Sequence, residues 1–83
     1  MYVRLEQVNH IKRQRRYYAL CLTQNLFGEW CVIREWGRIG LPDGGFMVDY
    51  PGSRRLAEEA FEDFKLEKLA AGYSPIPVQL TLF

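Results

Sequence analysis

The sequence is poor in the side chains from which metal sites and disulfide frameworks are built. Histidine occurs once, at His10, and cysteine twice, at Cys21 and Cys31. Structural zinc sites take four cysteine or histidine ligands at characteristic spacings, and no second cysteine lies at such a spacing here. Both cysteines fall within apolar runs, so we expect them to be buried thiols of a cytosolic protein. The sequence therefore predicts no metal, no cofactor and no disulfide framework.

Long apolar runs are also absent. No stretch approaches the roughly 20 apolar residues that a membrane-spanning helix requires. The residues that follow Met1 lack the apolar core of a signal peptide. We therefore expect a soluble, cytoplasmic protein that does not enter a membrane.

Catalytic motifs are the third absence. Pairing His10 with either cysteine gives no activated nucleophile, because both cysteines lie within predicted strands where nothing lowers the thiol pKa. Residues 40–45 lack the Gly-Lys-Ser/Thr of a phosphate-binding P-loop. Residues 37–40 match the Gly-x-x-Gly of a KH-type RNA clamp, but that clamp joins two helices, whereas this one follows a strand. We expect a protein that is not an enzyme and has no catalytic residues.

What is present is an ordinary globular composition with an uneven distribution of charge. The 83 residues are 48% hydrophobic and 25% charged, which suits one small domain. The net charge is +1, but residues 1–55 hold nine basic and five acidic side chains, whereas residues 56–83 hold two basic and five acidic ones. A basic N-terminal part and an acidic C-terminal part would orient the protein toward a polyanion.

Period-two patterns and turn residues predict a small antiparallel sheet. Apolar and aromatic residues alternate or cluster in four runs, which are residues 2–8, 17–23, 29–36 and 46–50. Asn25 and Gly28 are expected to adopt positive φ in the turn between the second and third runs.

The segment between the first two strands is strongly basic. Residues 9–16 predict either a solvated loop or an edge that contacts phosphates, and in the second case Arg13 and Arg16 are nucleic-acid ligands.

A helix is predicted after the fourth strand. Ser53 is the expected N-cap, and Gly72 is the expected stop. Apolar residues between them follow a 3.6-residue period at Ala57, Ala60, Phe61, Phe64 and Ala71. Lys68 falls on this apolar stripe. Either its stem covers the edge of the core while its ammonium reaches solvent, or the ammonium points at a ligand.

These elements give an α+β fold, a small antiparallel sheet with one long helix packed on it, followed by an extended tail. The predicted domain covers residues 1–73. Residues 74–83 form the tail, in which Pro75 and Pro77 favour an extended spacer.

The centre of the chain holds the combination Trp36-Gly37-Arg38. In a strand, Trp36 and Arg38 share one face, and Gly37 between them allows another backbone or a ligand to approach closely. An indole beside a guanidinium suits a nucleotide with its phosphate. The alternative is a core tryptophan that closes a hairpin.

These residues resemble a WGR domain, a family named for its Trp-Gly-Arg. The resemblance extends over residues 2–73 and rests on ordered motifs: Arg16-Tyr17-Tyr18, Trp30, residues 36–40, Lys68 and Gly72-Tyr73. The family fold is a small antiparallel sheet with a helix packed on it. In eukaryotes such domains occur in DNA-break-dependent poly(ADP-ribose) polymerases, and bacteria also carry them as small standalone proteins.

The resemblance implies DNA as the partner. By motif position, Trp36 would pack on the sugar of a terminal nucleotide, Arg38 would hold the adjacent backbone, and Lys68 would be a further contact. Nothing implies ADP-ribosylation, because no catalytic domain is present. We expect weak, salt-sensitive binding to DNA ends or nicks by a nucleoid-associated bacterial protein of DNA repair or replication.

The tail contains a second motif. Residues 79–83, Gln-Leu-Thr-Leu-Phe, resemble the Gln-Leu-(Ser/Asp)-Leu-Phe peptide with which bacterial polymerases and repair factors bind the replication sliding clamp. The resemblance implies that Gln79 makes polar contacts and that Leu80, Leu82 and Phe83 fill an apolar groove. Alternatively, the alternation of residues 78–83 predicts a further strand that completes the sheet.

Two functional classes remain open from the sequence. In the first, the protein is an adaptor that binds a DNA end through Trp36 and Arg38 and the clamp through its tail. In the second, the same surface binds a partner protein and no DNA. Steep salt dependence of DNA binding would distinguish the first from the second.

Overall fold

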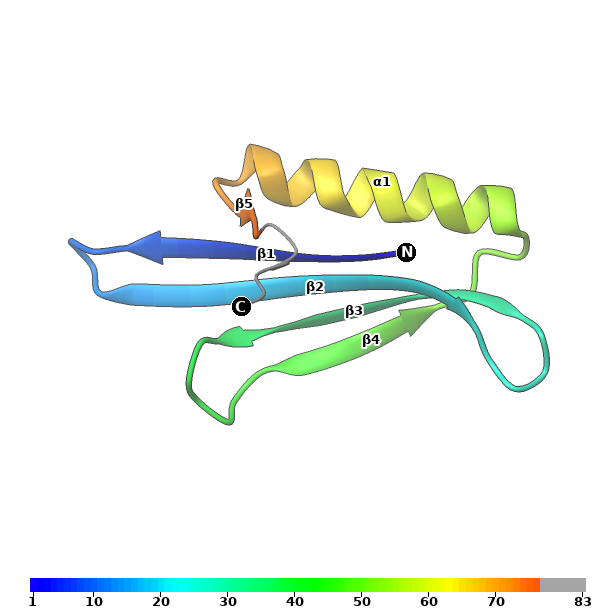
Figure 1. The fold of residues 1–83 in the computed structure, drawn as a ribbon, viewed down its shortest axis with the longest axis horizontal. Coiled ribbons are helices and arrows are strands. Elements are labelled where there is room, and N and C mark those ends of the chain that lie inside the picture. Colours follow the sequence, from blue (N-terminus) through cyan, green and yellow to red (C-terminus); the bar gives the residue numbers. More distant parts are fainter. Residues whose placement is uncertain (77–83) are drawn as a thin grey trace, which may run out of the picture.

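The computed structural model describes residues 1–76, so the motif at residues 79–83 lies outside the described part of the chain. One antiparallel sheet has the strand order β4-β3-β2-β1-β5, and helix α1 lies across one of its faces (Figure 1). The elements are β1 (Tyr2–Asn9), β2 (Gln14–Gln24), β3 (Trp30–Arg38), β4 (Gly45–Asp49), α1 (Arg54–Ala70) and β5 (Ser74–Pro75). The predicted fold class is confirmed.

Strand alternation gives the sheet one apolar face for the helix. The register places Tyr18 opposite Leu5 and Trp36, and Leu22 opposite Val32. On α1, residues four apart lie on one side, and Ala57 and Phe61 are buried against these strands. The core lies between β1, β2, β3 and the helix. In the described residues no helix is long and apolar enough to cross a membrane.

The helix ends are specified as the sequence predicts. The Ser53 side chain accepts a hydrogen bond of 3.2 Å from the Leu56 amide, which satisfies one of the free donors of the first turn. At the other end, Ala71 is the C-cap and Gly72 has φ 100°, a conformation that favours glycine. The predicted limits at Ser53 and Gly72 are confirmed, although Ala71 is exposed and Leu69 packs against the core in its place.

Two local predictions are wrong. The basic segment is not a loop along its whole length, because β2 begins at Gln14 and Arg16 pairs with both Gln7 and Arg38. Asn25 has no positive φ. Its side-chain oxygen instead accepts hydrogen bonds from the Phe27 and Glu29 amides, so it shapes the turn through its side chain.

The outer strands differ in how they end the sheet. Ser74 and Pro75, which were predicted to belong to the tail, pair with Glu6 and Leu5 on β1. Proline has no amide hydrogen, so Pro75 weakens the outer edge of β5 as a template for another strand. The edge at β4 contains neither lysine nor proline.

Candidate functional site

A groove of about 490 Å³ opens beside the C-terminal half of α1, at one end of the sheet. Aromatic and charged residues from β2, β3, the β3–β4 loop and α1 meet there, together with Tyr73, which follows the helix. Its lining consists of Arg16, Tyr17, Tyr18, Arg34, Trp36, Gly37, Arg38, Asp43, Gly44, Glu67, Lys68 and Tyr73. Four of the predicted contacts, Trp36, Arg38, Lys68 and Arg16, therefore share one groove with Gly37.

The position of Trp36 is compatible with both of the roles that the sequence left open. The indole is half-buried and packs against the core, and it also lines the groove. It lies over Gly45 on the neighbouring strand, where a Cβ would come within 3.1 Å of the ring. A strand glycine leaves a gap that a cross-strand aromatic ring covers, so Gly45 fixes the position of the indole.

Gly37 makes room for the protein's own atoms. A Cβ at this position would lie 2.8 Å from the Asp43 carbonyl oxygen and 2.9 Å from the Tyr17 ring. The close approach that the sequence predicted at this glycine is therefore made by the backbone of the β3–β4 loop and by an aromatic ring of β2. Gly37 brings the loop, and Asp43 with it, against the groove.

Arg38 reaches the groove with its charge partly neutralised. Its Nε donates a hydrogen bond of 2.6 Å to Oδ2 of Asp43, and the arginine side chain remains 60% exposed. The hydrogen bond and charge of the guanidinium hold the pKa of the Asp43 carboxyl below its usual range. An anion that binds Arg38 must therefore compete with Asp43.

Lys68 points its ammonium into the groove. Its Nζ lies 4.7 Å from the centre of the Tyr18 ring and 5.8 Å from that of Tyr73, within cation–π range. The two tyrosine rings themselves meet edge to face at 6.4 Å. The ammonium lies against aromatic rings that line the groove, so a ligand in the groove would be within its reach.

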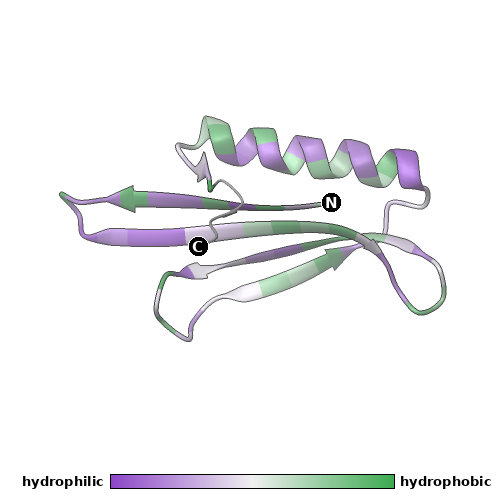
Figure 2. Cartoon of the chain, in the orientation of Figure 1, coloured by the Kyte–Doolittle hydropathy of each residue, from purple (hydrophilic) through white to green (hydrophobic). Residues whose placement is uncertain are grey.

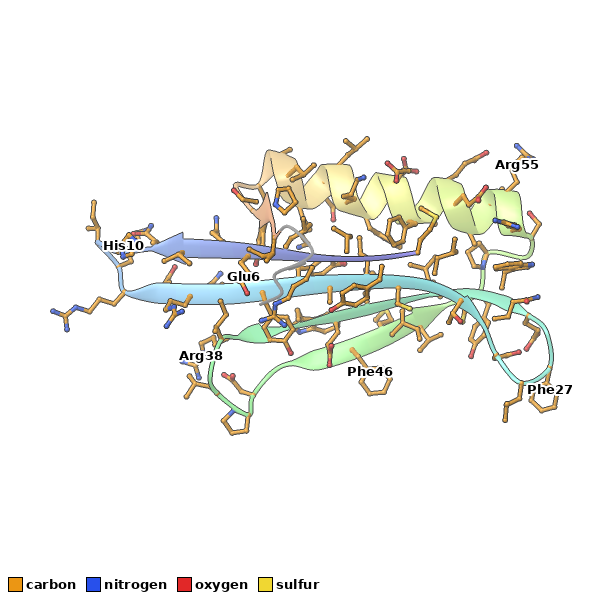
Figure 3. All side chains as sticks on the ribbon, in the orientation of Figure 1. Glu6, His10, Phe27, Arg38, Phe46 and Arg55 are labelled. Atoms are coloured by element: carbon orange, nitrogen blue, oxygen red, sulfur yellow. The ribbon has the colours of Figure 1, made fainter. Side chains whose placement is uncertain are left out.

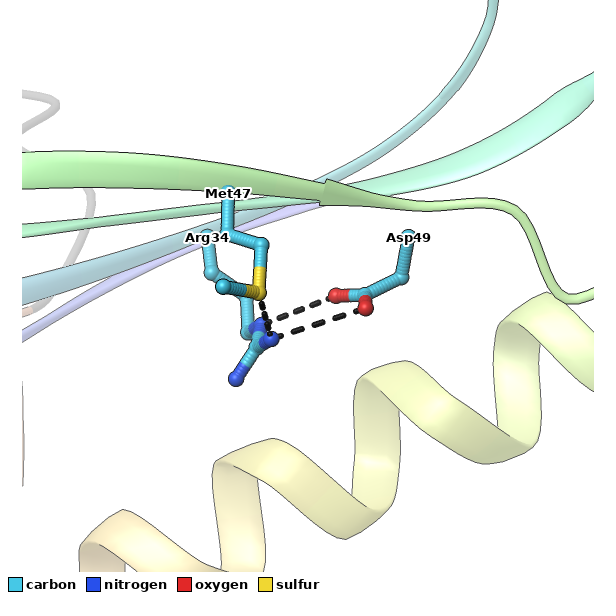
Figure 4. Close-up of polar contacts among 3 residues, drawn as sticks. All are labelled: Arg34, Met47 and Asp49. Atoms are coloured by element: carbon cyan, nitrogen blue, oxygen red, sulfur yellow. Dashed lines mark hydrogen bonds and ion pairs between the residues drawn. The ribbon is translucent and has the colours of Figure 1, made fainter.

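Arg34 also lines the groove, and the sequence did not identify it as a site residue. Its Nε donates a hydrogen bond of 2.8 Å to Asp49 Oδ2, its Nη2 contacts the Met47 sulfur (Figure 4), and its guanidinium stacks 4.4 Å from the Phe64 ring centre. Burial raises the pKa of the adjacent Tyr18 hydroxyl, which Arg34 opposes. A single arginine within an apolar run gives no sequence signal that it lines a site.

The groove carries more positive than negative charge. Arg16, Arg34, Arg38 and Lys68 face two carboxylates, Asp43 and Glu67. Within residues 1–76, Arg16 and Lys68 take part in none of the salt bridges, so their charges are available to a ligand. The lining combines four aromatic rings with cationic side chains, as a nucleotide and its phosphates require.

Arg13 lies outside this groove. It occupies the tip of the β1–β2 hairpin with φ 54° and lines two separate pockets there, one of which also includes Arg16 and Arg38. The hairpin tip lies at the same end of the molecule as Arg38, whereas Phe27 and Arg55 mark the far end (Figure 3). Arg13 therefore extends the positive charge of the groove end without lining the groove itself.

The structure offers no alternative centre for metal chemistry among its described residues, where no three histidine, cysteine, aspartate or glutamate side chains gather. Cys31 is buried on the sheet face opposite the helix, and burial raises the pKa of its thiol. Cys21 is half-buried on that same face. Neither thiol lines the groove.

Comparison with known proteins agrees with this architecture. The sequence profile of the WGR domain matches residues 1–79. The uncharacterized protein y4dW of Sinorhizobium fredii (strain NBRC 101917 / NGR234) is 38% identical over 73 residues, which is 88% of this chain. The chain spans about a third of that relative's length, 35%, so the relative contains much sequence that has no counterpart here.

Proposed function

The chain belongs to the WGR domain family, and from this premise we propose that it is a non-enzymatic protein that binds DNA ends or nicks through the groove at Trp36. The observation that supports the proposal is the convergence of the Trp36, Tyr18 and Tyr73 rings with Arg16, Arg38 and Lys68 on one groove. A terminal nucleotide presents a sugar face and an anionic phosphate together, and the groove offers a complement to each.

Each side chain has a separate role in this binding mode. The half-buried indole of Trp36 presents a rigid apolar surface for the terminal sugar. Lys68 is held against Tyr18 and directs its ammonium toward a phosphate, while Arg16 approaches from β2. Arg38 binds the adjacent phosphate of the DNA backbone after its ion pair with Asp43 breaks. Internal duplex offers no exposed terminal sugar, so ends and nicks are preferred.

A DNA titration with matched tryptophan variants tests this proposal. Trp30 and Trp36 are both half-buried on the same face of β3 and both pack against the core, but only Trp36 lines the groove. Trp36→Leu should weaken binding to nicked or blunt duplex about tenfold, because stacking on an aromatic ring is lost. Trp30→Leu should destabilise the fold comparably and leave DNA affinity unchanged.

The same titration is repeated with closed circular DNA as competitor and at two salt concentrations. Binding should favour nicked over closed circular DNA and should weaken steeply between two salt concentrations. Equal loss of affinity in the two tryptophan variants would mean that Trp36 acts only through stability. Absence of DNA binding even at low salt would sink the proposal and leave the second class, in which the groove binds a partner protein.

We further propose that residues 79–83 dock on the bacterial sliding clamp. The support is the sequence match alone, since these residues lie outside the described part of the chain. Purified clamp should bind the full chain and lose affinity for Leu82→Ala/Phe83→Ala, while Thr81→Ser, which restores the commoner residue, should bind at least as well. Equal clamp binding by the full chain and both variants, or no clamp binding by any of them, would reject the clamp as a partner. Neither result would bear on the proposal that the groove binds DNA.

A further inference from the structure

The edge of the sheet at β4 has none of the features that normally prevent strands from adding to it. Within the strand, Phe46 is 69% and Met47 is 49% exposed. The one charged side chain, Asp49, is held by Arg34 on the helix-facing side (Figure 4). Hydropathy colouring shows β4 as pale to apolar along its length, in contrast to the polar start of β2 (Figure 2). Natural edge strands usually carry lysine, proline or a covering element.

Nothing in residues 1–76 covers this edge. The helix packs over β2 and β3, and β4 is the outermost strand, next to β3 (Figure 1). At the other edge, the two-residue strand β5 pairs with Leu5 and Glu6 of β1, and its Pro75 donates no hydrogen bond. The unpaired amides and carbonyls of β4 therefore remain available to a second strand.

We propose that a second copy of this chain pairs with β4, strand to strand and antiparallel, centred on Met47. Met47 is the middle residue of the five in β4, so this register pairs the whole strand with its copy. The two-fold axis passes midway between the two Met47 residues, perpendicular to the sheet, and makes the contact self-complementary. The two five-stranded sheets join into one continuous sheet.

The side chains fit this register on both faces. Phe46 and Val48 share the face away from the helix, because they pair with Glu35 and Ile33 on β3. Across the dimer, Phe46 of one copy lies opposite Val48 of the other, a favourable aromatic and β-branched pair. On the helix-facing side Met47 meets its own copy, and Asp49 faces Gly45, so no like charges oppose each other.

The symmetry also fixes how the two grooves are disposed. An axis perpendicular to the sheet keeps both helices, and therefore both Trp36 grooves, on one face of the dimer. Each groove is close to the proposed interface, because Trp36 pairs with Gly45 on β4. Two grooves on one face would hold two ligands side by side, but the dimer proposal does not depend on what the grooves bind.

Sedimentation equilibrium from about 10 μM to 1 mM, without DNA, tests the dimer. A five-residue strand buries less than a standard interface, so we expect a dissociation constant of about 0.1 to 1 mM. In a dilution series, amide NMR shifts should change in residues 45–49. A protein that stays monomeric at 1 mM overturns the proposal.

Charge variants test the register. The double variant F46K/V48K places like charges opposite each other at two sites and should weaken the dimer at least about tenfold. The variant F46K/V48E has the same number of substitutions but places opposite charges together, and should restore the dimer. Phe27→Lys changes an exposed phenylalanine (87% exposed) at the far end of the sheet and should have no effect.

Thermal unfolding of all variants confirms that each is folded before its mass is compared. Loss of dimer in F46K/V48K with recovery in F46K/V48E supports the proposal. Loss in both variants, or a dimer that neither changes, contradicts the Met47-centred pairing.

Discussion

Arg38 shows how one neighbouring residue controls a binding side chain. The β3–β4 loop returns Asp43 to within 2.6 Å of the Arg38 Nε, because Gly37 lets the loop backbone approach. An exposed pair of this kind contributes little to stability. Its effect on ligand binding is larger, since a phosphate must displace the carboxylate before it occupies the guanidinium.

Replacing Asp43 by asparagine should therefore tighten DNA binding. The substitution removes both the intramolecular competitor and a negative charge from the groove. Because exposed pairs are weak, the expected gain is about two- to fivefold, measured by titration with nicked duplex at fixed salt. Glu59→Gln, which breaks a surface pair with Arg55 at the other end of the helix, is the control. Unchanged or weaker binding in Asp43→Asn would show that Asp43 does not compete with DNA.

The same pair can be followed through pH. Because Arg38 lowers the folded-state pKa of Asp43, the pair stabilises the protein above the ordinary aspartate pKa, and this contribution disappears as pH falls through the lowered value. In Arg38→Ala the pKa of Asp43 should rise to its ordinary range. Carboxyl carbon NMR titrations of the two proteins measure this, and identical titrations would mean that Arg38 and Asp43 are not paired in solution.

At the scale of the element, periodicity and turn chemistry made most of the fold predictable. The strands around Leu5, Leu20 and Val32 alternate, and the helix has Ser53 and Gly72 at its ends. The start of β2 was missed because its first three residues, Gln14, Arg15 and Arg16, are exposed and carry no apolar signal. A strand that extends beyond the core is specified by pairing with its neighbours, which the local sequence does not encode.

The site was predictable in part for the same reason. Trp36, Arg38, Lys68 and Arg16 belong to recognisable motifs, and the fold brings them together. The roles of Arg34 and Asp43 depend on partners 15 and 5 residues away in sequence, through cross-strand pairing and a loop return. Such contacts are set by tertiary structure, so neither residue is identifiable from its neighbours in the chain.

The β3–β4 loop should tolerate no side chain at Gly44. This glycine has φ 127°, and a Cβ there would collide with the Trp36 carbonyl oxygen. Gly44→Ala is expected to lower the unfolding free energy by at least about 2 kcal/mol. Gly28→Ala, with φ 79° and open space around it, should cost about 1 kcal/mol. Urea denaturation of both variants gives the comparison, and equal losses would contradict the collision.

The helix start should depend on its cap. Ser53→Ala removes the acceptor for the Leu56 amide, and no acidic residue in the first turn replaces it. The expected loss is about 1 kcal/mol, and Ser53→Asp should keep the stability because aspartate also caps and suits the helix dipole. Thermal unfolding of the two variants distinguishes a cap from an ordinary surface serine, at which both changes would be neutral.

At the scale of the whole molecule, charge is separated along the longest dimension of 43 Å. The groove and the hairpin tip gather basic residues at one end. At the other end Arg54 and Arg55 are each paired with a glutamate one turn along the helix. Among residues 1–76, the lysine and arginine side chains without a salt bridge therefore lie at the groove end, where a polyanion would meet them, and the net charge of +1 conceals this arrangement.

The salt dependence of DNA affinity should report how many phosphates the groove end contacts. Three contacts, from Arg16, Arg38 and Lys68, predict a slope of log affinity against log salt of about −2.1 to −2.7, which is about 20- to 40-fold between 50 and 200 mM. Lys68→Gln should reduce the slope by about 0.7 to 0.9. Arg55→Gln should leave it unchanged. A flat salt profile would exclude phosphate contacts by the groove.

The two tryptophans give the protein a built-in optical reporter. Six residues apart on β3, the indoles are separated by about 20 Å. Trp36 lines the groove, whereas Trp30 lies beside Arg54 at the far end, with the guanidinium 5.3 Å from its ring centre. A ligand in the groove alters the emission of one indole and leaves the other as an internal reference. Trp30→Phe therefore yields a single-emitter protein whose fluorescence reports occupancy of the groove without any attached label.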